Sequence, residues 1–153
     1  MNHHQPDHHN GPKSPEGSQE PRHRSERHPL IGDHFINHLI QQAPDPVAAA
    51  RITDAYGYHG TAMATFLGLD DTDPYDTNIA LDFLNCFHGR YNSMNDLIDE
   101  TIEVQGWNEA LNRMSVDYPG LDLVLSINRD AVADLIDMRF DVVDLGDLYV
   151  FEK

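Results

Sequence analysis

The stretch Ile127–Lys153, INRDAVADLIDMRFDVVDLGDLYVFEK, decides the fold class, because a helical pattern changes to a strand pattern within it. Asn128 has the side chain of a helix N-cap, and apolar residues follow at the spacing of one helix face. The residues that we expect to face inward are Val132, Leu135 and Ile136. The pattern predicts a helix that begins after Asn128.

Two short apolar segments after this helix predict an antiparallel hairpin. Phe140–Val143 and Leu148–Phe151 are rich in β-branched and aromatic side chains, which favour strands. Asp144–Asp147 connects them, and Gly146 suits a tight turn. A helix followed by a hairpin indicates an α+β fold, with a small β-containing unit at the C-terminal end.

A further helix is expected before this stretch, with Ser93 as its cap and Val104 near its end. Ser93-Met94-Asn95-Asp96 resembles a capping box, in which Asp96 occupies the first turn. Gly106 breaks this helix. Leu121–Ile127, which follows a Tyr-Pro-Gly turn, fits a strand, although its LDLVL core is too short to distinguish a strand from a helix.

Residues 30–90 carry the pattern of a small helical bundle, in which glycines, prolines and aspartates mark the helix ends. The apolar stripe of the last helix holds Ile79, Phe83, Leu84 and Phe87. We expect helices from the cap Asp33 to Ala43, from Pro46 to Tyr56 with Gly57 as the stop, from Thr61 to Leu67, and from the Asp73-Pro74 start to Gly89.

Composition divides the chain into three parts. Residues 1–29 hold most of the histidines and almost no large apolar side chains, so we expect a disordered His/Pro-rich tail there. The HHQPDHH motif within it is interpreted as solvated rather than as a metal site. A helical segment over residues 30–90 and an acidic α+β domain over residues 91–153 follow.

The negative charge is concentrated in residues 31–153. The chain has a formal net charge of −16, and residues 1–30 contain equal numbers of basic and acidic side chains. Residues 31–153 therefore hold 22 Asp and Glu against six Lys and Arg. Such a charge opposes direct binding to DNA or RNA, which depends on cations that neutralise phosphates. It favours encounter with a basic partner.

Cysteine usage and hydropathy favour a cytoplasmic protein. The single cysteine, Cys86, excludes an intramolecular disulfide and suits a reducing compartment. No apolar run approaches the roughly 20 residues of a membrane span, and residues 1–29 lack the apolar core of a signal peptide. We expect no membrane partner.

Acidic side chains recur on one face of each predicted helix of the C-terminal half. Those of the first helix fall within a sector of about 100°, opposite its apolar residues, and those of the second within about 60°. Like charges at this spacing destabilise a helix, and a surface selected for stability would interleave lysines. The predicted partner-binding residues are Asp96, Asp99, Glu100, Glu103, Asp130, Asp134 and Asp137, with Asp141, Asp144 and Asp147 of the hairpin.

The C-terminal half resembles the ArdA antirestriction proteins of plasmids, transposons and phages. The similar stretches are FHGRYNSMNDLIDETIE, over Phe87–Glu103, and Ile127–Lys153. In that family, Gly-x-Tyr and an acidic helix precede an Asp-rich helix and a terminal strand with Val-Phe. The residues that fit this pattern are Gly89, Tyr91, Asp96, Asp130, Asp134, Val150 and Phe151.

The resemblance implies an elongated homodimer that imitates bent DNA and blocks type I restriction-modification enzymes. Duplex DNA carries one charge per about 1.7 Å, so 16 charges correspond to about 8 base pairs. The chain departs from the family at its start, where a His-rich tail and helices replace a sheet-containing N-terminal domain. A shorter mimic of this kind would cover less of the enzyme's DNA groove.

Motifs for other chemistry are weak. His34 and His38 stand at i and i+4 on one predicted helix face, but the stretch lacks the Glu of a zinc protease and a third ligand. Asp71–Asp76 lacks the glycine and terminal Glu of a calcium loop. Cys86 lies in an apolar pattern typical of packing. We expect no enzyme activity and no cofactor.

The sequence therefore predicts an acidic DNA mimic that inhibits a basic DNA-binding enzyme, with type I restriction-modification as the expected target. The alternative is an acidic interaction or regulatory module with a salt-adapted surface and no mimicry. Aspartate outnumbers glutamate by 19 to 7 and there are only two lysines, a bias that a halophilic or GC-rich source also produces.

Overall fold

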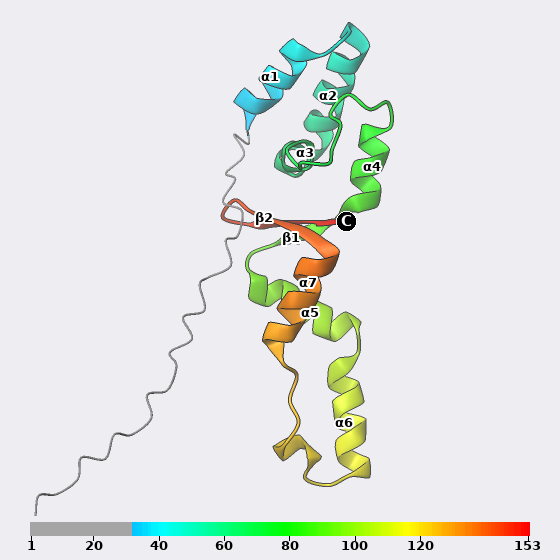
Figure 1. Cartoon of the computed structure of the whole chain (residues 1–153), viewed down its shortest axis with the longest axis vertical. Helices are drawn as coiled ribbons and strands as arrows, with labels where there is room; N and C mark the ends of the chain where they lie inside the picture. The colour runs from blue at the N-terminus through cyan, green and yellow to red at the C-terminus, as the bar shows by residue number, and fades with distance from the viewer. Residues whose placement is uncertain (1–31) are drawn as a thin grey trace, which may run out of the picture.

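The structure, a computed structural model, describes residues 32–153, so the tail predicted for residues 1–29 lies outside the described residues. The α+β class and the order of helices first and hairpin last are confirmed (Figure 1). The elements are α1 Asp33–Gln42, α2 Pro46–His59, α3 Thr61–Leu67, α4 Ile79–Cys86, β1 Phe87–Tyr91, α5 Met94–Val104, α6 Trp107–Asp117, the 3-10 helix η1 Leu121–Leu123, α7 Arg129–Arg139, β2 Phe140–Asp144 and β3 Leu148–Glu152.

The strands form an antiparallel sheet in the order β1-β3-β2, with β3 in the centre. β2 and β3 are the predicted hairpin, in which Asp144 pairs with Leu148 across the turn. Gly146 in that turn has a φ of 98°, which a glycine adopts without strain. Its backbone N–H donates to the Asp144 carboxylate over 3.0 Å.

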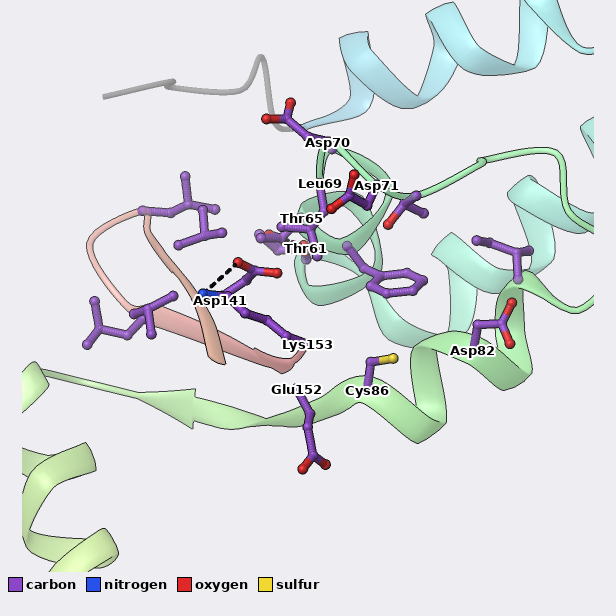
Figure 2. Close-up of a pocket in the computed structure, with 18 of the residues that line it drawn as sticks. Thr61, Thr65, Leu69, Asp70, Asp71, Asp82, Cys86, Asp141, Glu152 and Lys153 are labelled. Atoms are coloured by element: carbon purple, nitrogen blue, oxygen red, sulfur yellow. Dashed lines mark hydrogen bonds and ion pairs between the residues drawn. The ribbon is translucent and has the colours of Figure 1, made fainter. Parts of the chain in front are cut away.

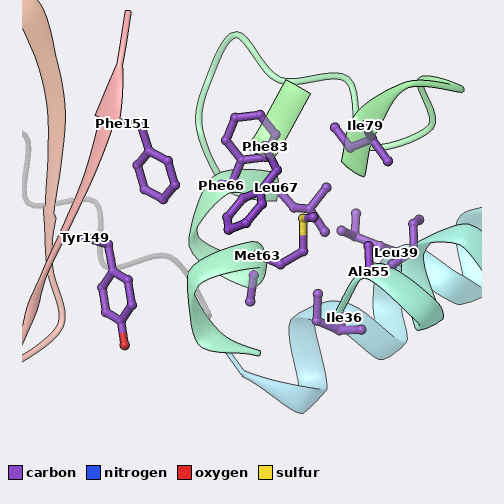
Figure 3. Packing of buried hydrophobic residues seen from close by; sticks show 12 residues of the cluster. Ile36, Leu39, Ala55, Met63, Phe66, Leu67, Ile79, Phe83, Tyr149 and Phe151 are labelled. Atoms are coloured by element: carbon purple, nitrogen blue, oxygen red, sulfur yellow. The ribbon is translucent and has the colours of Figure 1, made fainter. Parts of the chain in front are cut away.

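The central strand β3 separates two hydrophobic cores. Tyr149 and Phe151 point into a core built by α1 to α4, as Figure 3 shows. Leu148 and Val150 pack on the opposite face with side chains of α5 and α7. A strand that is covered on both faces has a continuous run of apolar residues. All four of these residues are at most 7% exposed. The sheet is therefore the middle layer between two groups of helices (Figure 1).

Strand β1 was not predicted. Phe87 was assigned to the preceding helix, but α4 ends at Cys86, and Phe87 pairs with Phe151 of β3. The register then shifts between Phe87 and Gly89, and Tyr91 pairs with Leu148. The boundary predicted between residues 90 and 91 thus falls inside a strand that joins the helical segment to the C-terminal hairpin.

Two predicted helix ends near residues 57 and 74 were wrong. α2 continues through Gly57 to His59, because Gly60, with a φ of 56°, supplies the stop. α4 begins at Ile79 and not after Pro74. Asp73 and Asp76 accept backbone hydrogen bonds two residues ahead, over 2.9 and 2.6 Å, and hold this segment in turns.

The region between α5 and α7 also differs from expectation. Leu121–Ile127 is not a strand, because a short 3-10 helix and irregular chain replace it, and the helix α6 before it was not predicted. Leu84 and Leu135 were expected to face inward, yet they are 60% and 48% exposed. α4 and α7 therefore pack through a narrower face than the spacing of their apolar residues implies. Within the described residues, no helix is long and apolar enough to cross a membrane.

Candidate partner-binding surface

The acidic row of α5 lies on the solvent side of that helix. The Ser93 hydroxyl accepts a hydrogen bond from the backbone N–H of Asp96 over 3.2 Å, which confirms the predicted cap. Leu97, Ile98 and Ile102 are at most 5% exposed and anchor the opposite face. The four carboxylates of Asp96, Asp99, Glu100 and Glu103 are consequently all exposed.

Asp99 and Glu100, which lie on the two flanks of this row around the helix axis, contact neighbouring elements. Asp99 forms an ion pair with Arg129, the first residue of α7. The Glu100 carboxylate accepts a hydrogen bond from the Tyr91 hydroxyl over 2.9 Å. Among the described residues, no hydrogen bond or ion pair involves the carboxylates of Asp96 and Glu103, so these two carboxylates are free for a partner.

Gly89 and Tyr91 hold the Glu100 side chain in place. A Cβ added at Gly89 would lie 3.1 Å from Cε2 of Tyr91, so the bare glycine leaves room for the tyrosine ring. Burial, followed by the hydrogen bond to Glu100, raises the pKa of Tyr91 to about 12. The Gly-x-Tyr pattern thus has a local structural reason, which is independent of any partner.

The acidic row of α7 has no ion-pair partner in the described part of the chain. The Asn128 side chain accepts from the backbone N–H groups of Asp130 and Ala131 over 3.1 and 3.2 Å, and this confirms the predicted cap. Val132 and Ile136 face the core at 3% and 1% exposure. The exposed carboxylates on the remaining flank are those of Asp130, Asp134 and Asp137.

Packing brings the two acidic helices together. Side chains of α5 and α7 share one hydrophobic core. Besides pairing with Asp99, Arg129 donates to the side-chain and backbone oxygens of Asn95 over 3.3 and 3.4 Å. The sequence placed the two rows on separate helices, and the structure joins them through this arginine.

The three hairpin carboxylates do not form one site. Asp147 forms an ion pair with Arg90 of β1, and Asp141 lies 3.7 Å from the Lys153 ammonium. Asp144 is exposed, and its side chain caps the turn. Asp141 and Asp147 are therefore partly neutralised, and the helices carry most of the unpaired charge.

A groove of about 1430 Å³ between α3, α4 and the hairpin collects further carboxylates (Figure 2). Asp141 and Lys153 line one side, and Asp70 and Asp71 lie opposite. Sequence reasoning did not place these loop aspartates in a site, because helix caps and turns account for the same residues. The other carboxylates in the lining are Asp73, Asp76, Asp82, Asp144 and Glu152.

Metal-ligating and nucleophilic groups do not converge in the described residues. No group of three or more His, Cys, Asp and Glu side chains there has an arrangement that could hold a metal ion. His34 and His38 are exposed on α1. Burial, then the nearby carboxylates of Asp82 and Glu152, raises the pKa of the Cys86 thiol, which disfavours the nucleophilic thiolate.

Comparisons of the chain with protein-family models, with curated proteins and with solved structures found no match.

Proposed function

We propose that this chain is an acidic DNA mimic that inhibits a DNA-binding enzyme by occupying its basic groove, with a type I restriction-modification enzyme as the target. The observation that carries the proposal is the set of exposed carboxylates on α5 and α7 that make no hydrogen bond or ion pair in the described structure. These five residues, which we call the open acidic set, are Asp96, Glu103, Asp130, Asp134 and Asp137.

The spacing of the acid supports mimicry of a phosphate backbone. At a rise of about 1.5 Å per residue, the row from Asp96 to Glu103 extends over about 10.5 Å. Its four carboxylates then stand about 3.5 Å apart along the helix axis, on average. One strand of duplex DNA carries one charge per about 3.4 Å. The row of α7 covers a similar length with three carboxylates.

The resemblance to the ArdA proteins supports the same target, because Asp96, Asp130 and Asp134 fit that family's acidic pattern and belong to the open acidic set. An inhibitor of this kind acts by occupancy, so inhibition should be stoichiometric and the protein itself should carry out no reaction. Salt should weaken it, because the contact consists mainly of exposed charge pairs.

The test is a competition assay. A type I restriction-modification enzyme bound to labelled DNA is titrated with the full chain at roughly physiological salt. The variant Glu103→Gln with Asp134→Asn removes two charges from the open acidic set. The control Glu109→Gln with Asp54→Asn removes the same charges from exposed positions on α6 and α2. Each pair of exposed charges contributes about 0.5–1 kcal/mol, so the first variant should inhibit about 5- to 30-fold less strongly.

Two outcomes would contradict the proposal. Equal losses in the variant and its control would show that net charge alone matters and that the two rows are not the binding surface. Absence of displacement at large excess of the wild type would remove the assigned target.

The alternative, an interaction module with a salt-adapted surface, is favoured by one observation on α7. Leu135 and Met138 are 48% and 70% exposed on the flank next to the acidic row, as in a protein contact made by apolar side chains. Binding of a partner that is insensitive to neutralisation of the open acidic set, but lost in Met138→Ser, would support this module over the DNA mimic.

A further inference from the structure

The groove between α3, α4 and the hairpin contains more negative charge than its own lining neutralises. Among the described residues that line it, eight are acidic and Lys153 alone is basic, which gives a net charge of −7. Lys153 is paired with Asp141, and Glu152 pairs with Arg139 outside the lining. Carboxylates that are held close together repel one another and destabilise the compact state. The groove is therefore a surface that a cationic group would stabilise.

The sheet offers an open edge to the same groove. β2 is an edge strand, and no backbone group of residues 141–144 makes a hydrogen bond outside the β2–β3 pair in the described part of the chain. Asp141 and Val143 pair with the two β3 residues that point into the α1–α4 core, so they share the sheet face that borders the groove. An extended peptide can bind such an edge through its backbone, while its side chains provide specificity. The groove thus suits an extended segment with basic side chains.

The described part of the chain begins close to this groove. Phe35, near the start of α1, packs against the same core as Leu69, which lines the groove. Figure 1 shows the start of α1 on the side of the molecule where the hairpin turns, and Figure 2 shows it near Asp70. Residues 1–31 are therefore joined to the fold beside the groove.

One stretch of residues 1–31 has the charge that the groove lacks. Residues 22–28, RHRSERH, contain three arginines and one glutamate, a net charge of +2, whereas the other residues of this region sum to −2. The stretch is the longest one there without proline, and Pro29 favours an extended backbone at the residue before it. At up to about 3.5 Å per residue, the ten residues that separate its first arginine from Gly32 span up to about 35 Å. This span is about twice the length of the five-residue strand β2.

The basic residues of the described part are already engaged or lie elsewhere. Residues 32–153 contain six Lys and Arg side chains, and five of them make a hydrogen bond or an ion pair in the described structure. The sixth, Arg113, lies on α6, on the opposite side of the sheet from the groove. The cations closest along the chain to its first described residue are the three arginines of residues 22–28.

We infer that residues 22–28 bind in this groove of their own chain, extended along β2 with their arginines on its carboxylates. An arginine can donate two parallel hydrogen bonds to one carboxylate. The covalent link gives the segment an effective concentration of about a millimolar, so several weak contacts together hold it. The bound segment changes the charge of the groove from −7 to −5 and leaves α5 and α7 as the principal acidic surface. The inference does not depend on the proposed function, because no target enzyme takes part in the contact.

Paramagnetic relaxation enhancement in the full chain tests the contact. A nitroxide spin label is attached at Ser25→Cys in a Cys86→Ser background, so that the label lies in the middle of the segment. The amide signals of residues 68–76 and 141–146, on both sides of the groove, should broaden, whereas those of α6 should not. The same spectra show whether each variant remains folded.

A charge variant of the groove has a matched control. Asp71→Asn with Asp141→Asn removes two charges from the lining, and it should weaken binding of the segment at least about fivefold, with a corresponding loss of broadening. Asp54→Asn with Glu109→Gln removes the same number of charges from exposed positions on α2 and α6, and it should leave the broadening unchanged.

The segment itself is tested in the same way. Arg22→Gln should weaken binding about two- to fivefold, whereas Lys13→Gln, which lies outside residues 22–28, should have a smaller effect. Raising the NaCl concentration should reduce the broadening, because the contact consists mainly of exposed charge pairs. Broadening that is insensitive to salt would contradict this mode of binding.

A mixed sample identifies the occupant of the groove. Spin-labelled chains without isotope enrichment are combined with isotope-enriched chains that carry no label, and no broadening should appear if the segment binds its own chain. Broadening as strong as that within one chain would assign the groove to a second copy and overturn the inference. Equal broadening of the groove and α6 would also overturn it, as would equal losses in the groove variant and its control.

Discussion

Arg129 is the residue at which the acidic surface is organised. It is the first residue of α7, and it contacts Asp99 and Asn95 of α5. Its side chain is 43% exposed and that of Asp99 is 64% exposed, so the ion pair is screened and contributes little to stability. Its larger effect is to set the position of α7 against α5, since it contacts two residues of that helix, Asp99 and Asn95.

Replacing Arg129 tests this role. Arg129→Gln should lower the free energy of unfolding by about 0.5–1 kcal/mol, because an exposed ion pair and two weak hydrogen bonds are lost. Arg113 on α6 makes no hydrogen bond or ion pair in the described structure, so Arg113→Gln is a suitable control and should change stability less. Urea denaturation of both variants measures the difference, and equal losses would show that Arg129 has no organising role.

Tyr91 predicts a pH dependence at the residue scale. Its pKa is raised to about 12 from 10.0 by burial and by Glu100, so the folded state favours the neutral phenol. This contribution to stability is fully present below pH 10 and is lost as the pH rises towards 12. The wild type should therefore lose more stability across this interval than Tyr91→Phe does. Tyr58→Phe, at an 87% exposed ring, should retain the full loss of the wild type.

At the scale of the helix, the carboxylates of a row are not equivalent. Asp96 and Asp130 lie in the first turns of α5 and α7, where the positive end of the helix dipole stabilises a negative charge. Glu103 and Asp137 lie near the opposite ends, where the dipole is unfavourable, and α5 has no basic residue in its last turn. Acid near the C-terminal ends of α5 and α7 is therefore the strongest sign that something other than stability selects these residues.

Neutralisation should change stability in opposite directions along each helix. Glu103→Gln and Asp137→Asn should each raise the free energy of unfolding by about 0.3–1 kcal/mol. Asp96→Asn and Asp130→Asn should lower it or leave it unchanged. Thermal unfolding at low ionic strength measures all four variants. If all four were stabilised equally, net charge and not the position in the helix would control the effect.

At the scale of the whole molecule, like-charge repulsion opposes the compact state. A net charge of −16 on 153 residues should make stability rise with NaCl before specific effects dominate at molar concentrations. We expect the midpoint of thermal unfolding to rise by several degrees between low and physiological ionic strength, which corresponds to about 1 kcal/mol. The double variant Glu103→Gln with Asp134→Asn should show a smaller rise. A midpoint that falls with salt would mean that attractive ion pairs outweigh repulsion.

The two layers of helices have different functions in this scheme. α1 to α4 bury the aromatic side of β3 through Phe66, Phe83 and Phe151, whose rings lie 5.7 to 6.4 Å apart. They supply the larger core and carry none of the open acidic set. α5 and α7 hold that set on the other side of the sheet, and α6 extends beyond them. The larger core and the proposed partner-binding surface thus lie on opposite faces of the sheet.

The sequence by itself determined the features that depend on contacts within a few residues. The cap at Ser93 bonds to a backbone three residues ahead, and the turn at Gly146 is closed by Asp144 two residues before it. The alternation of α5 between buried and acidic faces follows from helix geometry alone. For these reasons the two acidic helices and the hairpin were predicted correctly.

Only the tertiary structure decided the features that join distant parts of the chain. FHGRY has the composition of a helix end, and it becomes a strand because β3, about 60 residues later, presents backbone groups for pairing. Asp147 loses its free charge to Arg90, 57 residues away, and Asp99 to Arg129, 30 residues away. Which carboxylates stay open to a partner depends on these long-range pairs, and local sequence patterns contain no information about them.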